Sequence, residues 1–298
     1  MRIGLLTAAW IVTATAAFAQ DARPIIASRA DLPPTRFEVE RPPSEIYLSP
    51  EFLNAMLPRI RSESERLLSD YKITDPEIEA RLRIGLASIA LLQSRPEDSV
   101  ALIREQRTRE AKPQMREVGY LVREAMAAGA AAPVSTRCDA AVRTLSETLR
   151  PAAPSVVRDE VLARYGVVQT ASPAFHAGSA ALVVDPEAKA QGSIDVMGGL
   201  ALASMAAEAL YVPPCREPLA AALKAWLDVP SHRPADIWPE REPTAADLEG
   251  SRPVTVAVLE SGFDRTLFAG RMAFDPAEPL DGVDNDGNGV IDDAFGPT

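Results

Sequence analysis

The stretch Thr74–Leu92, TDPEIEARLRIGLASIALL, decides the fold class of the main part of this chain. It starts with Thr-Asp-Pro-Glu, a pattern typical of a helix N-terminus with proline in the first turn. Apolar side chains then recur at helical spacing and fill much of the surface: Ile78, Leu82, Ile84, Leu86, Ile89 and Leu92. A helix that is apolar on so many sides must be buried, so we expect it to be central.

Similar patterns on both sides of this helix predict an α-helical domain over residues 49–228. Ser49-Pro50-Glu51 and Pro96-Glu97-Asp98 each start a helix. Residues 166–192 are less regular, and we expect a short strand at Ala181–Val184. Short polar turns favour antiparallel hairpins, as in a bundle or a helical solenoid, although the signature of a tetratricopeptide-like repeat of about 34 residues is missing. Further helices are expected near residues 112–128, 138–150, 154–165, 193–211 and 216–228.

Two proline-rich segments flank this domain. Residues 20–48 contain five prolines and show no period, so they are expected to form an extended lead-in. Residues 229–252 contain four prolines, which break helices and central strands, and they are interpreted as a linker. A second domain is therefore expected over residues 253–298.

The first nineteen residues have the pattern of a secretory signal peptide. Met1-Arg2 is basic, Ile3 to Phe18 is apolar, and Ala17-Phe18-Ala19 is a cleavage signature that leaves Gln20 as the mature start. An uncleaved anchor is the alternative, but the apolar run is short and rich in Ala and Thr. We expect an exported protein, periplasmic or secreted, with no membrane-spanning segment after cleavage.

Composition and charge restrict the partners. Hydrophobic residues make up 47% and aromatic residues 5%, so the core must consist mostly of Ala, Leu and Val. The net charge of -11 argues against binding to nucleic acid or anionic lipid. Export would permit a disulfide between Cys138 and Cys215, and two buried free thiols are the alternative.

A buried strand is expected near the start of the second domain. Val254 to Leu259 is a β-branched apolar run of the kind found in parallel sheets, and it ends at Glu260. In open α/β sheets, ligands and catalytic groups collect at the carboxyl ends of such strands. Glu260 is therefore a candidate functional residue; a surface carboxylate without a role is the alternative.

Two motifs in this domain resemble the subtilisin-like serine peptidases (subtilases). VTVAVLESGFD (254–264) is similar to the first catalytic motif, usually V-A-V-[IL]-D-[TS]-G-[IV]. LDGVDNDGNGVIDDAFG (280–296) is similar to an Asp-rich segment that many bacterial subtilases carry after that motif. The resemblance covers about residues 252–297 only. It implies the truncated start of an α/β subtilisin-like domain.

The resemblance implies a role for Glu260 but leaves the catalytic triad incomplete. Glu260 lies where the family has the Asp that orients the catalytic histidine, and Glu is one methylene longer. The family's H-G-T-H and G-T-S-x-A-x-P motifs do not follow. His176, His232 and Ser204 precede Glu260, in the wrong order for the family. We therefore expect this chain to be inactive as a peptidase. Either the coding sequence continues past Thr298 and the chain is truncated, or the chain is a natural remnant of a peptidase.

The Asp-rich segment also predicts a cation site. After Arg271 the chain has no Lys or Arg. The spacing of oxygen-bearing side chains from Asp284, with Gly289 at the sharp turn, fits the first half of an EF-hand calcium loop. Phe295 takes the place of the final Glu, and a solvated turn without metal is the alternative. The candidate Ca²⁺ ligands are Asp284, Asp286, Asn288, Val290, Asp292 and Asp293.

Two functions remain open from these patterns. The first is an exported subtilisin-like serine endopeptidase, or a degenerate relative, that acts on polypeptides and is represented by an incomplete chain. The second is a non-enzymatic envelope or periplasmic scaffold, with a helical binding domain and a calcium-binding loop. The sequence indicates no partner for the helical domain.

Overall fold

The computed structural model describes residues 23–230, 241, 243–244, 246–252, 254 and 275–292. These residues belong to two compact units that divide between residues 235 and 236, and each is described by itself. The expected signal peptide, residues 255–259 of the expected strand, Glu260 and Asp293 lie outside the described residues.

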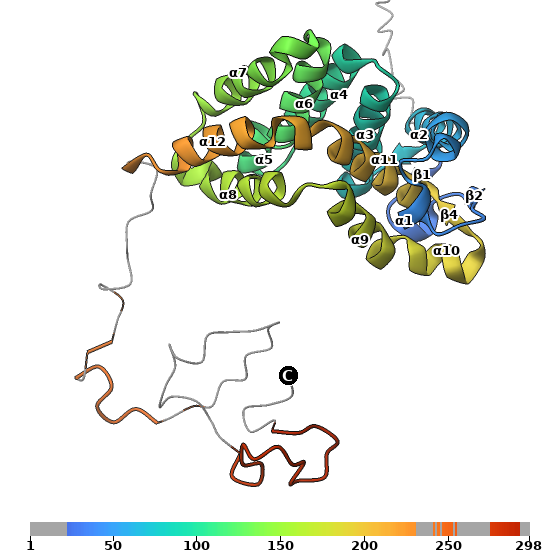
Figure 1. The fold of residues 1–298 in the computed structure, drawn as a ribbon. Coiled ribbons are helices and arrows are strands. Elements are labelled where there is room, and N and C mark those ends of the chain that lie inside the picture. Colours follow the sequence, from blue (N-terminus) through green and yellow to red (C-terminus); the bar gives the residue numbers. More distant parts are fainter. Residues whose placement is uncertain are drawn as a thin grey trace, which may run out of the picture. The chain divides into compact units, whose positions relative to one another are not determined.

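The first unit is mainly helical (Figure 1). A π-helical turn at Glu51–Met56 leads directly into α2. Short strands form two pairs: β1 (Ile25–Ile26) runs parallel to β3 (Lys72–Ile73), and β2 (Arg36–Glu38) runs antiparallel to β4 (Ser193–Asp195). The helices are α1 (Pro43–Ile46), α2 (Leu57–Asp70), α3 (Pro76–Leu92), α4 (Pro96–Arg109), α5 (Pro113–Val118), α6 (Leu121–Ala131), α7 (Arg137–Leu149), α8 (Pro154–Thr170), α9 (Pro173–Val183), α10 (Asp185–Gln191), α11 (Val196–Tyr211) and α12 (Arg216–Leu227).

Helix α3 is central, as its sequence predicts. The Asp75 carboxylate accepts hydrogen bonds from the N–H groups of Glu77 and Ile78, which satisfies two donors at the helix start. Ile78, Leu82 and Ile89 are buried in one hydrophobic cluster. The other end of the helix contributes Leu91 to a second cluster, so α3 connects both halves of the core.

Helix α11 is the second connecting element and packs along α3. Leu200 and Ala203 belong to the first cluster, whereas Ala207 belongs to the second. Glycine allows the close approach: a Cβ added to Gly85 of α3 would lie 2.4 Å from Leu200 Cδ2. The interface therefore depends on small residues, in agreement with the low aromatic content of the chain.

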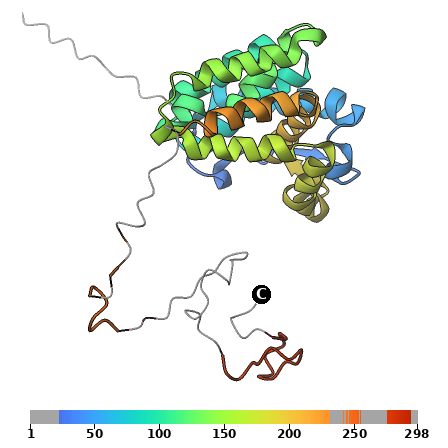
Figure 2. The same ribbon diagram turned by 60° about the vertical axis from the view of Figure 1, so that its left-hand side comes forward.

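Helices α7, α12 and α8 form one layer of the domain, with α12 in contact with both neighbours (Figures 1 and 2). Leu219, Leu223 and Leu227 of α12 lie one turn apart and are buried in the second cluster. A disulfide joins Cys138, in the first turn of α7, to Cys215, which immediately precedes α12. The two cysteines singled out in the sequence are thus bonded, and the bond ties one end of this layer.

Three details differ from the sequence-based expectations. Residues 23–48 are not merely an extended lead-in, because β1, β2 and α1 pack into the core through Ile26, Phe37 and Ile46. The helix expected near 112–128 is two helices, separated by Tyr120 at a φ of 63°. Ala181–Val184 is not a strand: residues 181–183 end α9, and the strand in this part of the chain is β4.

One described stretch, Val196–Leu227, is long and apolar enough to span a membrane by length and composition. A second stretch that meets these two criteria was not expected from the sequence. However, 61% of its most apolar window is buried inside the fold. The stretch is also interrupted by the 3-10 turn Pro213–Cys215, so it comprises two core helices, α11 and α12.

The longest described stretch of the second unit is 275–292, which contains most of the Asp-rich segment. It consists of turns and bends, without a helix or strand among those residues. Positive φ angles at Gly282, Gly287, Gly289 and Asp292 let the chain turn repeatedly within this short distance. The α/β fold expected of this unit falls largely on residues outside the description.

Candidate functional site

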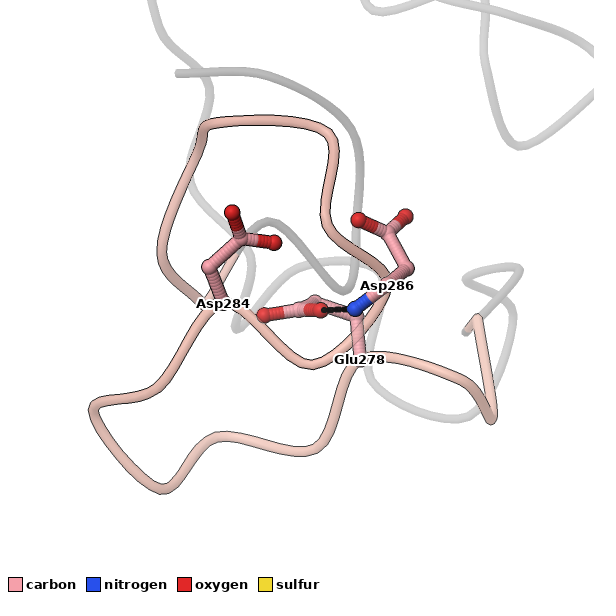
Figure 3. Close-up of side chains that lie close together, drawn as sticks. All are labelled: Glu278, Asp284 and Asp286. Atoms are coloured by element: carbon pink, nitrogen blue, oxygen red, sulfur yellow. Dashed lines mark hydrogen bonds between the residues drawn. The ribbon is translucent and has the colours of Figure 1, made fainter.

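Three carboxylates of the acidic loop 275–292 come together. Each of Glu278, Asp284 and Asp286 offers an oxygen atom, and these atoms all lie within 4.8 Å of one another. Figure 3 shows the Glu278 carboxylate between the side chains of the two aspartates. Separations of this size allow one cation to contact all three groups.

Glu278 organises the loop from its centre. Its side chain is fully buried, with an exposed fraction of 0%. Oε2 accepts hydrogen bonds from the N–H groups of Asn285, at 2.9 Å, and Asp286, at 3.0 Å. Oε1 accepts a hydrogen bond from the N–H of Asp292 at 3.1 Å. The three bonds fold the chain around one carboxylate. A carboxylate has about four acceptor sites, so the hydrogen bonds from described residues leave about one for a cation.

Asp284 holds the turn that follows it. Oδ1 accepts hydrogen bonds from the N–H groups of Gly287 and Asn288, and Oδ2 accepts one from Gly289 at 2.9 Å. The positive φ of Gly287 and of Gly289 makes this tight wrap available at low steric cost. The Asp284 carboxylate is thereby fixed beside Glu278 before any ligand binds.

The other predicted ligands occupy different places. The Asn288 amide donates a hydrogen bond to Asp286 Oδ2, and Asn288 Oδ1 accepts one from the N–H of Val290. Asp292 Oδ1 accepts hydrogen bonds from the N–H groups of Asp281 and Gly282, both at 2.8 Å. Of the predicted ligands, Asp284 and Asp286 belong to this carboxylate cluster. Asn288, Val290 and Asp292 take part in the hydrogen bonds of the same loop.

Glu278 is the site residue that the sequence-based interpretation missed. The EF-hand spacing starts at Asp284, and Glu278 precedes it by six residues. The available signal was the acidic run itself, which includes Glu278 and has no basic residue. Treating every acidic residue of this short segment as a candidate ligand would have included Glu278.

The electrostatics of the loop favour a cation. Residues 275–292 contain six acidic side chains and no Lys, Arg or His. Carboxylates this close repel one another, and a bound divalent cation removes that repulsion. The arrangement offers oxygen ligands and negative charge; among these residues there is no nucleophile paired with a base.

Ser204 and His176 belong to a polar network inside the helical domain. Ser204 Oγ lies 3.3 Å from Ser88 Oγ and accepts a hydrogen bond from Arg123 Nη1 at 3.1 Å. Arg123 pairs with Glu208 at 2.8 Å, and His176 Nε2 lies 3.9 Å from the other oxygen of Glu208. In the described part of the chain no hydrogen bond joins His176 to Ser204, so the network is not a nucleophile–base pair.

The environment of His176 predicts a stability that falls at acid pH. The residue is 3% exposed, and the pKa of its side chain is lowered by burial and by Arg123, partly opposed by Glu208. The unfolded chain therefore takes up a proton near pH 6.5, before the folded chain does. Stability from this residue is complete above pH 6.5 and is lost as pH falls toward the folded-state pKa.

The measurement is the free energy of unfolding between pH 5 and pH 8 for the wild type and His176→Gln. We expect a steeper acid loss in the wild type, by at most about 1.4 kcal/mol per pH unit. Parallel curves for the two proteins would show that burial of His176 does not control its protonation.

Comparison with known proteins gives no family assignment. No protein-family model matches the sequence, and neither a curated protein nor a solved structure matches it. The functional argument therefore depends on the residues themselves.

Proposed function

We propose that the loop 275–292 binds a calcium ion through Glu278, Asp284 and Asp286. The observation that carries this proposal is the convergence of three carboxylate oxygens within 4.8 Å in a segment without a basic residue. Hydrogen bonds from backbone N–H groups already hold Glu278 and Asp284 in place. Because these two side chains are already ordered, calcium binding would cost little of their conformational entropy.

The chemistry of the loop favours calcium over softer metals. Residues 275–292 contain no His or Cys, the ligands that zinc and copper prefer. Calcium takes six to eight oxygen ligands in flexible geometry and accepts backbone carbonyls and water beside carboxylates. Magnesium demands near-ideal octahedral geometry, which an irregular loop supplies less readily.

We expect Asp284→Asn to weaken calcium binding about tenfold or more. The substitution removes a negatively charged ligand, and calcium affinity depends on the number of charged ligands. Isothermal titration of the whole protein with Ca²⁺ measures this. Asp275→Asn is the matched control: it removes the same charge from the same loop, but Asp275 is not part of the cluster. Its affinity should stay within about twofold of the wild type.

Two results would contradict the cation proposal. One is the absence of Ca²⁺ binding by the wild type at millimolar concentration. The other is an equal loss in Asp284→Asn and Asp275→Asn, which would show a diffuse response to charge and no defined site.

A second candidate function is serine-type proteolysis. Its support is the order of two motifs, VTVAVLESGFD and then the Asp-rich segment, which resembles the opening of a subtilase catalytic domain. On this proposal Glu260 orients the catalytic histidine, and polypeptides are the substrates. The histidine and serine would have to come from residues that follow Thr298. The non-enzymatic alternative keeps the calcium loop and gives the helices a scaffold role in the cell envelope.

The compartment is part of the same proposal. We propose that residues 1–19 are removed on export to the periplasm or the medium. The Cys138–Cys215 disulfide supports this, because such bonds persist in oxidising compartments and are rare in the cytosol.

The intact mass of the protein from its native host separates the candidates. A mass well above 32.0 kDa would mean that residues follow Thr298 and would favour the peptidase. A mass about 2 kDa below 32.0 kDa would fit loss of the signal peptide alone and would exclude the subtilase mechanism.

A further inference from the structure

A hollow on the helical domain is lined largely by arginine. It lies where α4 and α5 pack together and has a volume of about 600 Å³. Ligand pockets for small molecules typically measure about 300–1,000 Å³. The lining residues are Arg104, Arg107, Thr108, Pro113, Arg116 and Glu117.

Positive charge exceeds negative charge around this hollow. Arg104 and Arg107 share one carboxylate, that of Glu124, with contacts of 2.6 Å and 2.5 Å. Glu117 supplies one further negative charge, and its Oε2 accepts a hydrogen bond from the N–H of Ala153. Three guanidinium groups thus face two carboxylates. The excess stands out because the chain as a whole carries a charge of -11.

Among the described residues, these guanidinium groups have N–H donors that make no hydrogen bond. Arg107 uses Nε on Gly119 O and Nη2 on Glu124, which leaves Nη1. Arg104 uses Nε on Glu124, which leaves both terminal nitrogens. Arg116 is exposed, and within the described ranges its side chain makes no hydrogen bond or ion pair. Such free donors match the acceptor oxygens of phosphate and carboxylate groups.

We propose that this hollow binds the phosphate or carboxylate group of a small ligand. Glu124 is 2% exposed and holds the Arg104 and Arg107 side chains at the edge of the hollow, so these donors are ordered in advance. Arg116 of α5 supplies the charge that no other described group neutralises. Thr108 and Pro113 provide uncharged surface for the rest of the ligand. The proposal is independent of calcium binding by the second unit.

The test is isothermal titration of the whole protein with inorganic phosphate and, separately, with succinate, at low ionic strength. Tighter binding of one probe identifies the group that the site prefers. Arg116→Gln should weaken binding of the preferred probe about tenfold, as expected for loss of a charge-assisted contact. Because Arg116 is exposed, its replacement should leave the thermal midpoint nearly unchanged.

Arg41→Gln is the matched control. Arg41 precedes α1 and is also an exposed arginine, with one long contact of 3.9 Å to Glu51. The Arg41→Gln variant should bind the preferred probe with the affinity of the wild type. The proposal is overturned if neither probe binds the wild type at millimolar concentration, if Arg116→Gln binds normally, or if Arg41→Gln loses as much affinity as Arg116→Gln.

Discussion

Replacement of Cys138 and Cys215 together by alanine is expected to lower the free energy of unfolding by about 4 kcal/mol. The two residues are 77 positions apart, so their bond closes a long loop and removes much conformational freedom from the unfolded chain. Cys215 is also buried beside the apolar residues of α7 and α12. Urea denaturation of the oxidised wild type and of the double variant measures the difference.

The reduced wild type is the control for this prediction. Reduction should bring the wild type close to the double variant, whereas reductant should leave the variant unchanged. A variant within 1 kcal/mol of the oxidised protein would contradict the prediction and show that Leu219, Leu223 and Leu227 hold α12 without the bond. The size of the effect also bears on export, because a domain that needs this bond would be unstable in a reducing cytosol.

The sequence predicted those helices whose apolar residues recur at helical spacing and whose ends carry typical N-terminal residues. The apolar surface of α3 was visible from its residues alone, and the structure confirms that it is central. Helix α9, PAFHAGSAALV, has no charged residue and no polar face, so its sequence did not distinguish helix from strand. The β2–β4 pair joins Arg36 to Asp195, and no period within either segment could reveal such a distant contact.

In the acidic loop, too, residues at a known local spacing were predicted, whereas a contact with a residue farther along the chain was not. Asp284 and Asp286 follow from a known spacing, and both belong to the cluster. Glu278 joins them because the chain folds back so that its carboxylate accepts N–H groups seven, eight and fourteen residues later. Such contacts depend on the backbone conformations of the glycines in the loop. The sequence shows that glycine can adopt these conformations but does not show which one each glycine adopts.

Replacement of Glu124 by alanine is expected to cost about 3–5 kcal/mol of folding stability. Glu124 lies on α6 and pairs with Arg104 and Arg107 of α4, so it links two packed helices. Arg107 is only 13% exposed and would keep its charge without a carboxylate beside it, whereas Arg104, at 63%, can be hydrated. Urea denaturation measures the loss, and Arg104→Gln should cost about 1 kcal/mol or less.

A double variant separates the loss of a contact from the cost of an unpaired charge. In Glu124→Leu with Arg107→Met, apolar side chains replace both buried partners, and most of the lost stability should return. An equal loss in the double variant and in Glu124→Ala would mean that packing around Glu124, and not the isolated charge of Arg107, sets the cost. The same double variant should bind phosphate or succinate weakly even when folded, because Arg107 is absent and Glu124 no longer orients Arg104. Stability that recovers while anion binding does not would show that this buried charge is kept for recognition at the hollow.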